Sequence, residues 1–258
     1  MPKYSIVVEY IGTNYSGSQK QPNMVTVQSE LEKAIRTLIK GSETNPDEPK
    51  IIFSGRTDAG VHSKGQVVHF VSEKSFVASK FLNSLNGLLP SDISVRDLQL
   101  VDNDFHAQKS AQWRWYQYKI VNRQQRSVWD GHSLLVRYPL NVQRMNKGLS
   151  YLLGRHDFTS FRSQTANPAR ECIVYKAECK KIEDIIYFDI IANRFLYNMV
   201  RTIVGTMLFI EANDLPAETF REILEAKDRT KAAATINADG LTLMHVGYSS
   251  FSEENIKQ

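Results

Sequence analysis

The sequence lacks the features that mark secreted, membrane-spanning and disordered proteins. Two cysteines in 258 residues cannot cross-link a fold of this size into a disulfide scaffold. The longest strongly apolar run, residues 199–212, contains Arg201 and is too short to cross a bilayer. Strand-forming residues begin almost at once, without the basic and apolar segments of a signal peptide. We therefore expect a cytoplasmic protein that does not contact a membrane.

The composition is that of a folded globular protein. Apolar residues make up 42% of the chain and charged residues 23%, which is enough apolar material for a core. The length fits one large domain or two small ones. Cys172 and Cys179 lie an odd number of positions apart on a predicted strand, so we expect two buried thiols on opposite faces. Without other Cys or His residues at ligand spacing nearby, no zinc site is predicted.

Basic residues gather in the second half of the chain. Residues 1–104 contain 11 basic and 12 acidic residues, whereas residues 105–258 contain 21 basic and 16 acidic ones. Residues 105–129 mix cations with Trp and Tyr and contain no acidic residue. This mixture suits RNA with unstacked bases, although an aromatic core face beside a solvated basic face would give the same pattern. Candidates for contacts with an RNA backbone lie here and in a second basic segment, 155–170: Lys109, Arg114, Arg123, Arg126, Arg155, Arg162 and Arg170.

Hydrophobic periodicity predicts the same order of elements twice. In the first half, strands are expected at 3–10, 50–54, 65–71 and 93–101, and helices at 26–40 and 77–89. In the second half, strands are expected at 111–121, 171–181, 185–191 and 242–249, and helices at 141–153, 193–211 and, as an insertion, 216–227. Each half therefore reads βαββαβ, which is the ferredoxin-like (RRM-like) unit. The predicted fold is α+β, with two such units at 1–104 and 105–258, joined antiparallel sheets and a central cleft.

The ends and inner faces of two helices can also be predicted. Thr26 can cap the start of the first helix and Gly41 can end it. In the second helix, the helical spacing predicts one buried face made of Val77, Phe81, Leu85 and Leu88.

The most distinctive local feature is the segment Ser54–His62, between two predicted strands. Gly55 and Gly60 allow tight turns. Arg56 and Asp58 are separated by one residue, so a loop could present both to one pocket. An Asp in such a loop is also common as a turn or cap residue. His62, like His69 further on, is either a structural histidine or a base.

Here the sequence resembles a known family, the TruA-type tRNA pseudouridine synthases. The central match is GRTDAGVH at 55–62, followed by GQVVHF at 65–70. Further similar pieces follow in family order: TVQ at 26–28 with Leu31 and Glu32, LPSDI at 89–93, FHA at 105–107, Arg114 with Tyr116 and Tyr118, Gly154 with HDF at 156–158, Phe195 with Leu196 and MVR at 199–201, and Gly240 with Leu241. The resemblance therefore covers nearly the whole chain.

The resemblance implies a reaction and a substrate. Such enzymes convert uridine to pseudouridine in tRNA: the N1–C1′ bond breaks, the uracil turns, and C5 bonds to C1′. The product is an isomer, so no cofactor or metal is expected. The implied targets are positions 38, 39 and 40 of the anticodon arm. The base must first leave its stack, which costs a few kcal/mol. The resemblance also implies a homodimer whose RNA site spans both subunits.

The resemblance also implies the catalytic residues. Asp58 supplies the carboxylate that attacks the sugar or removes a proton from it. Both routes need an ionised carboxylate, and Arg201 matches the cation that would offset the effect of burial on its pKa. Tyr116 would stack on the flipped uracil. Arg56 would hold a phosphate or the displaced base.

Two further residues are implied to bind substrate. Leu241 would line the uracil pocket, although ordinary core packing is an equal alternative. His62 follows the catalytic loop and is the second candidate.

The chain departs from the family pattern at several positions. Ser18 stands where the family usually has Trp, Gln108 where Arg is common, and Trp113 and Trp115 where smaller or basic residues are usual. These differences bear on how the RNA is positioned. The alternatives are a catalytically silent RNA-binding protein, a paralogue that modifies a different RNA, and an unrelated hydrolase that pairs Asp58 with a second carboxylate.

Overall fold

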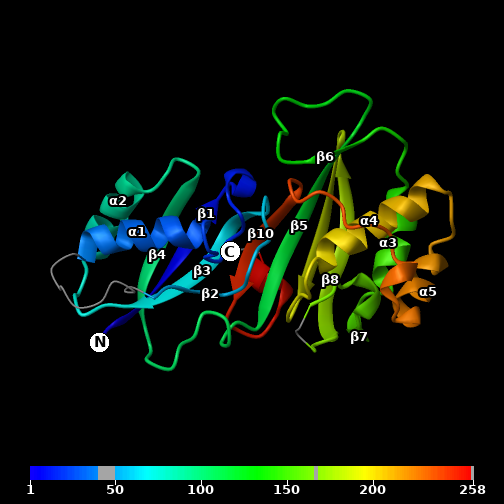
Figure 1. The fold of residues 1–258 in the computed structure, drawn as a ribbon. Coiled ribbons are helices and arrows are strands. Elements are labelled where there is room, and N and C mark those ends of the chain that lie inside the picture. Colours follow the sequence, from blue (N-terminus) through cyan, green and yellow to red (C-terminus); the bar gives the residue numbers. More distant parts are fainter. Residues whose placement is uncertain (40–49, 166–167, 257–258) are drawn as a thin grey trace. The chain divides into compact units, whose positions relative to one another are not determined.

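The computed structural model describes residues 1–39, 50–165 and 168–256. The chain divides into two compact units. One contains Met1–Gln112 and Leu243–Ser249, and the other contains Trp113–Thr242 and Ser250–Gln258. Both are mixed α+β with mostly antiparallel strands, which confirms the predicted class (Figure 1). Among the described residues, no helix is long and apolar enough to cross a membrane.

The first unit places two helices against an antiparallel sheet. Its strand order is β4-β1-β3-β10, and β2 also pairs with β3. Its elements are β1 (Lys3–Tyr10), α1 (Val27–Ile39), β2 (Ile52–Phe53), β3 (His62–Val71), α2 (Ala78–Leu88), β4 (Ile93–Val101) and most of β10 (Leu241–Gly247). β10 is linked to β3 by a hydrogen bond from Ser63 Oγ to the carbonyl of Leu243, at 3.2 Å.

Alternation along β1 builds the core of the first unit. Every second residue is buried: Tyr4, Ile6, Val8 and Tyr10. They belong to one apolar cluster with buried side chains of α1 and α2. Burying an aliphatic side chain of this size stabilises the fold by about 1.5–3 kcal/mol. This core fixes the strands on which the Ser54–His62 segment depends.

The helix ends of this unit are partly as predicted. Thr26 Oγ1 accepts from the backbone N–H of Ser29 at 3.2 Å, so the predicted cap is confirmed. The predicted end at Gly41 lies outside the described residues. In α2 the buried face is narrower than predicted, because Val77 is 63% exposed and Leu88 is 45% exposed. Val77 has an extended backbone and precedes the helix, while Leu88 is its last residue.

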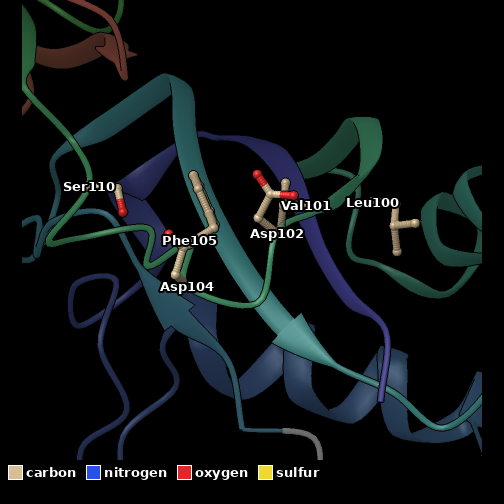
Figure 2. A pocket seen from close by; sticks show the side chains of 6 residues that line it. All are labelled: Leu100, Val101, Asp102, Asp104, Phe105 and Ser110. Atoms are coloured by element: carbon tan, nitrogen blue, oxygen red, sulfur yellow. The ribbon is translucent and has the colours of Figure 1, made fainter.

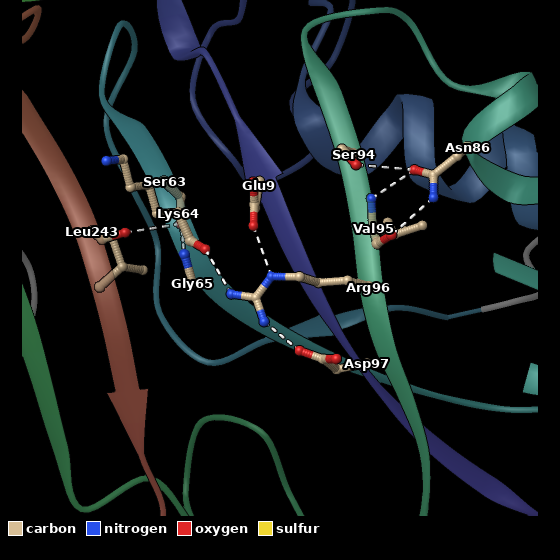
Figure 3. A network of polar contacts seen from close by, with 10 residues as sticks. All are labelled: Glu9, Ser63, Lys64, Gly65, Asn86, Ser94, Val95, Arg96, Asp97 and Leu243. Atoms are coloured by element: carbon tan, nitrogen blue, oxygen red, sulfur yellow. Dashed lines mark hydrogen bonds and ion pairs between the residues drawn. The ribbon is translucent and has the colours of Figure 1, made fainter. Parts of the chain in front are cut away.

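Arg96 joins three strands of the first unit (Figure 3). Its Nε donates to Glu9 of β1 at 2.7 Å, and another nitrogen donates to the carbonyl of Lys64 in β3 at 3.2 Å. A third contact is to its neighbour Asp97, which has a positive φ of 55° beside an irregularity in the pairing of β1 and β4. Both acidic partners are about half exposed, so each ion pair contributes at most about 1 kcal/mol.

The second unit has its own strand order, β5-β9-β8-β7, with β6 parallel to β5. Its elements are β5 (Trp113–Asn122), β6 (Leu134–Val136), α3 (Val142–Ser150), β7 (Gly154–Asp157), β8 (Glu171–Ile182), β9 (Ile185–Ala192), α4 (Met199–Ala212) and α5 (Glu218–Ala226). β6 and β7 were not predicted, because three or four residues are too few to show alternation. Apart from α4, the predicted elements begin and end within three residues of the observed ones.

The helix predicted at 193–211 begins later, at Met199. Asn198, just before it, has a φ of 62°, a left-handed backbone that no helix continues through. Upstream, Asn193 exchanges bonds with Ile173: its N–H donates to the Ile173 carbonyl and its Oδ1 accepts from the Ile173 N–H. Tertiary hydrogen bonds therefore override the apolar pattern, and Arg201 moves into the first turn of the helix.

The two cysteines are buried thiols as predicted, but the prediction of opposite faces is wrong. Cys172 lies two residues before Val174 and therefore on the same face of β8. Val174 pairs with Ala192 of β9, and Cys179 pairs with Phe188. Partners four residues apart on β9 lie on one face. The register of β8 shifts between Val174 and Lys176, and this irregularity inserts the residue that reverses the alternation.

An ion pair connects α3 to α4. Arg144 donates to both carboxylate oxygens of Glu211, at 2.6 and 3.1 Å, and the Glu211 side chain is fully buried. The backbone N–H of Asn141, which caps α3, donates to the same carboxylate at 2.8 Å. The buried charge is thus matched by three donors.

We predict that Arg144→Met lowers the free energy of unfolding by about 2 kcal/mol, because the Glu211 carboxylate loses charged donors in a buried place. Urea unfolding would measure it. Arg155→Met is the matched control: it removes an exposed pair with Glu171 and should change stability by less than about 0.5 kcal/mol. Equal effects of the two substitutions would contradict the prediction.

Candidate active site

The Ser54–His62 segment connects β2 to β3 and contains both buried and exposed side chains. Thr57 is buried, whereas Arg56 is exposed and Asp58 is half-buried. Gly60 has a positive φ of 80°, and the N–H of Val61 donates to the carbonyl of Asp58 at 3.1 Å. The loop therefore turns tightly just after Asp58, as expected for Gly60.

Thr57 anchors this loop through its side chain. Its hydroxyl is 2.8 Å from the phenol oxygen of Tyr10, at the end of β1. Tyr10 is only 3% exposed, and burial raises its pKa to about 12. The phenol therefore stays protonated even near pH 10, where an ordinary tyrosine ionises, and keeps its bond to Thr57.

The backbone of Thr57 is held by a second segment of the same unit. Its N–H donates to Ser18 Oγ at 2.9 Å, and its carbonyl accepts from the N–H of Ser18 at 3.1 Å. On the β3 side, Gln66 is fully buried and its amide nitrogen donates to the carbonyl of Gly55 at 3.0 Å. The residues on both sides of Arg56 are thus fixed by buried groups.

Both histidines of this region hold backbone N–H groups. His62 is 2% exposed, and its Nδ1 accepts from Gly12 at 2.9 Å. His69 Nδ1 accepts from Ala107 at 3.1 Å. Burial, with smaller contributions from His106 and Lys3, lowers the pKa of His69 to about 4. These contacts favour the structural interpretation of both rings.

Tyr116 lies on β5 of the second unit and is mostly buried. The ring of Phe195 packs edge-on against it, with 4.9 Å between ring centroids. Nearby on the strand, Arg114 donates to the carbonyl of Asn193 at 2.8 Å. The irregular segment before α4 therefore lies along the start of β5 and orients the Tyr116 ring.

Arg201 is a half-buried cation held in place by its own unit. Its Nε donates to the carbonyl of Ile236 at 2.8 Å, and another nitrogen donates to Asn198 Oδ1 at 2.9 Å. A cation in the first turn of a helix opposes the helix dipole by about 0.3–1 kcal/mol, whereas an anion there is favoured. The site is therefore suited to an anionic partner for Arg201.

Leu241 is 5% exposed at the start of β10, and its N–H donates to the carbonyl of Ala238 at 2.7 Å. This burial agrees with the core-packing alternative.

The predicted RNA-backbone contacts fall into two groups. In each half-buried member, a guanidinium nitrogen donates to a backbone carbonyl. Arg114 donates to the carbonyl of Asn193 at 2.8 Å, and Arg162 donates to the carbonyl of Ala169 at 2.9 Å. The exposed members are Lys109, Arg123, Arg126, Arg155 and Arg170. The exposed group is the better placed to meet phosphate.

A pocket of about 390 Å³ lies elsewhere in the first unit (Figure 2). It is lined by Leu100, Val101, Asp102, Asp104, Phe105 and Ser110, none of which is a predicted site residue. Its two carboxylates disfavour a phosphate ligand. Among the described residues, no group of three or more His, Cys, Asp or Glu side chains could hold a metal ion.

Sequence reasoning assigned no positioning role to four residues that hold the candidate groups. Ser18 and Gln66 hold the loop, while Phe195 and Asn198 hold Tyr116 and Arg201. Ser18 was visible only as a departure from a family pattern. The left-handed Asn198 had no signal inside an apolar, helix-like run.

Comparison with known proteins identifies the family. The model of the tRNA pseudouridine synthase family matches residues 6–108 and 149–249. A tRNA pseudouridine synthase A of Thermoanaerobacter sp. (strain X514) is 41% identical over 250 residues, covering 96% of this chain and 100% of the relative. That of Francisella philomiragia subsp. philomiragia is 40% identical over 256 residues, covering 98% and 96%.

Among solved structures, the crystal structure of a Cbf5-Nop10-Gar1 complex aligns with a TM-score of 0.37 at 9% identity, covering 79% of this chain and 53% of that chain. The sequence matches alone carry the assignment. The proteins that the chain matches in sequence are enzymes that modify RNA. This chain belongs to the tRNA pseudouridine synthase family, which removes the unrelated hydrolase from the alternatives.

We predict that His69 makes the stability of the protein fall as pH is lowered from about 6.5 to about 4. The unfolded chain takes up the proton in this range before the folded one does, so unfolding becomes easier by at most about 1.4 kcal/mol per pH unit. Above pH 6.5 this contribution is fully present. His69→Asn keeps an acceptor for Ala107 without the titration, so urea unfolding should show a shallower pH dependence. Equal slopes for both proteins would contradict the assignment.

Proposed function

We propose that this chain, as a tRNA pseudouridine synthase, modifies uridines 38, 39 and 40 of the anticodon arm. It isomerises uridine to pseudouridine in tRNA: the N1–C1′ bond breaks, C5 bonds to C1′, N1 gains a proton, and the C5 hydrogen is lost to solvent. The observation that carries the proposal is the Asp58 loop. Its GRTDAGVH sequence matches the family, and buried hydrogen bonds hold it on both sides of Arg56.

Asp58 acts as the catalytic carboxylate in this proposal, either on C1′ or on a sugar proton. Arg201 is its cationic partner and keeps the carboxylate ionised. The anion-favouring position of Arg201, in the first turn of α4, supports this pairing. Tyr116 stacks on the flipped uracil, and Arg56 holds a phosphate or the displaced base. The edge-on packing of Phe195 supports the Tyr116 role, because it leaves fewer orientations to the ring.

Leu241 and His62 complete the proposed set of site residues. The burial of both residues supports roles in shaping the site more than direct contact with RNA.

The proposal includes the fold on which these residues act. We propose that residues 1–104 and 105–258 are two ferredoxin-like units with joined antiparallel sheets, and that uridine enters a cleft between them. The order of β4, β1 and β3, with β2 on β3, supports this for the first unit. A cytoplasmic homodimer is proposed on the family resemblance alone.

The loop Ser127–Asp130 adds a second kind of RNA contact. Trp129 is 95% exposed and Val128 is 75% exposed. The loop is nevertheless fixed: Ser127 Oγ donates to Asp130 at 2.6 Å, and Lys119 forms an ion pair with the same carboxylate. An exposed ring on a fixed loop near Arg126 suits stacking on an unpaired base.

The function is tested by tritium release from tRNA transcripts labelled at uridine C5. The wild-type protein should release tritium, because C5 loses its hydrogen. Asp58→Asn should release none while still binding tRNA, because the amide is neither a nucleophile nor a base. Transcripts with cytidine at 38, 39 and 40 should release none with the wild type.

Each other result of this experiment would contradict one part of the proposal. Tritium release by Asp58→Asn would remove Asp58 from the chemistry. Release from the cytidine transcript would point to a different target. No release by a folded wild-type protein that binds tRNA would indicate a silent binder.

We predict that Trp129→Ala weakens tRNA binding by about 5- to 100-fold, the worth of one stacked base. Filter binding at several salt concentrations would measure this. Val128→Ala, on the same loop but without a ring, should change affinity by less than about twofold. Arg126→Ala should instead make the salt dependence less steep, by about one unit of slope. Equal affinities of the Trp129→Ala and wild-type proteins would exclude the stacking role.

A further inference from the structure

We infer that Ser18 is a positioning residue for Asp58, and that the pair Gly17–Ser18 is the platform on which the catalytic loop rests. This inference rests on the proposed role of Asp58. Ser18 stands where the family resemblance predicts Trp, so the family pattern does not assign this role to its side chain.

Ser18 contacts the residue directly before Asp58 in both directions. Its Oγ accepts the N–H of Thr57 at 2.9 Å, and its N–H donates to the Thr57 carbonyl at 3.1 Å. Ser18 is fully buried and Thr57 is 6% exposed. The Thr57 carbonyl belongs to the peptide group that leads into Asp58, so the two bonds together fix the direction in which the Asp58 side chain leaves the backbone.

Gly17 brings the platform against the loop. It has a φ of 94°, and a Cβ placed there would lie 2.8 Å from the Thr57 carbonyl oxygen and 3.5 Å from the carbonyl carbon of Asp58. Those distances leave no room for a side chain. The two backbones therefore pack directly, without an intervening side chain that could change rotamer.

The platform is in turn fixed by α1. The carbonyl of Gly17 accepts the N–H of Val27 at 3.3 Å, and that of Ser18 accepts the N–H of Gln28 at 3.0 Å. Both N–H groups belong to the first turn of α1, where backbone N–H groups have no acceptor inside the helix. Val27 and Leu31 are fully buried in the core, so the platform is coupled to the core of the first unit.

Upstream, the platform is fixed by Asp92. Its carboxylate accepts from Asn14 at 3.0 Å and from the phenol of Tyr15, and its carbonyl accepts from the N–H of Ile11 at 3.0 Å. Hydrogen bonds therefore hold the chain on either side of Gly17–Ser18.

Removing the Ser18 hydroxyl leaves the Thr57 N–H buried without its acceptor. The peptide must turn toward another partner, and the carboxylate at position 58 moves with it. A displacement of about 1 Å in a catalytic group can cost a factor of about 100 in rate. Because Ser18 is fully buried, it cannot contact RNA in this conformation, so tRNA binding should be preserved.

The test is the single-turnover rate of tritium release, measured with tRNA-binding affinity and urea unfolding. Ser18→Ala should lower the rate by about 10- to 100-fold with tRNA affinity within about twofold of wild type. The control is Ser72→Ala, which removes another buried serine hydroxyl that accepts a backbone N–H, that of Lys74 at 3.1 Å. It should keep the wild-type rate. Ser18→Thr, which retains the hydroxyl, should recover most of the rate.

The outcomes separate this inference from the proposed function. Wild-type turnover by Ser18→Ala, an equal loss in Ser72→Ala, or a Ser18→Thr protein as slow as Ser18→Ala would each overturn the positioning role while leaving Asp58 untouched. A parallel loss of rate and tRNA affinity would also overturn it. Turnover by Asp58→Asn would instead remove the proposed role of Asp58 itself.

Discussion

The close packing of two backbone segments is the constraint on which the first unit depends. Gly17 and Ser18 lie directly against Thr57, and the same two residues complete the hydrogen bonding of the first turn of α1. This one contact therefore stabilises the loop and the start of the helix together, and connects both to the core. A catalytic carboxylate on a loop needs such support, because loops have few contacts of their own.

The second unit orients its candidate groups by different means. Arg201 and Tyr116 are placed by the irregular segment before α4, where the left-handed Asn198 interrupts a run that would otherwise be helical. The break puts Arg201 in the first turn, where a cation opposes the helix dipole. Local strain and an unfavourable charge position thus coincide at a candidate functional residue, which is where such compromises are common.

Local patterns predicted the regular elements, and non-local contacts account for the differences. The alternation of apolar residues predicted β1, and the capping side chain of Thr26 predicted the start of α1, because each signal depends on neighbours in sequence. The faces of Cys172 and Cys179 could not be predicted, because one irregularity in β8 reverses the alternation. The role of Ser18 was equally hidden, since its partner Thr57 is 39 residues away. The motif around Asp58 indicated the candidate site, but the groups that hold it come from distant segments.

The place of β10 in the first unit affects the order in which the protein can fold during synthesis. Its residues Leu243–Gly247 belong to the first unit and lie beside β3, where Ser63 bonds to Leu243. A ribosome has synthesised the whole second unit up to Thr242 before it supplies this strand. The unit that carries the Asp58 loop is thus begun first and completed only after residues 113–242 have been made. The growing chain consequently cannot assemble the complete sheet of the first unit until Leu243–Gly247 have been added.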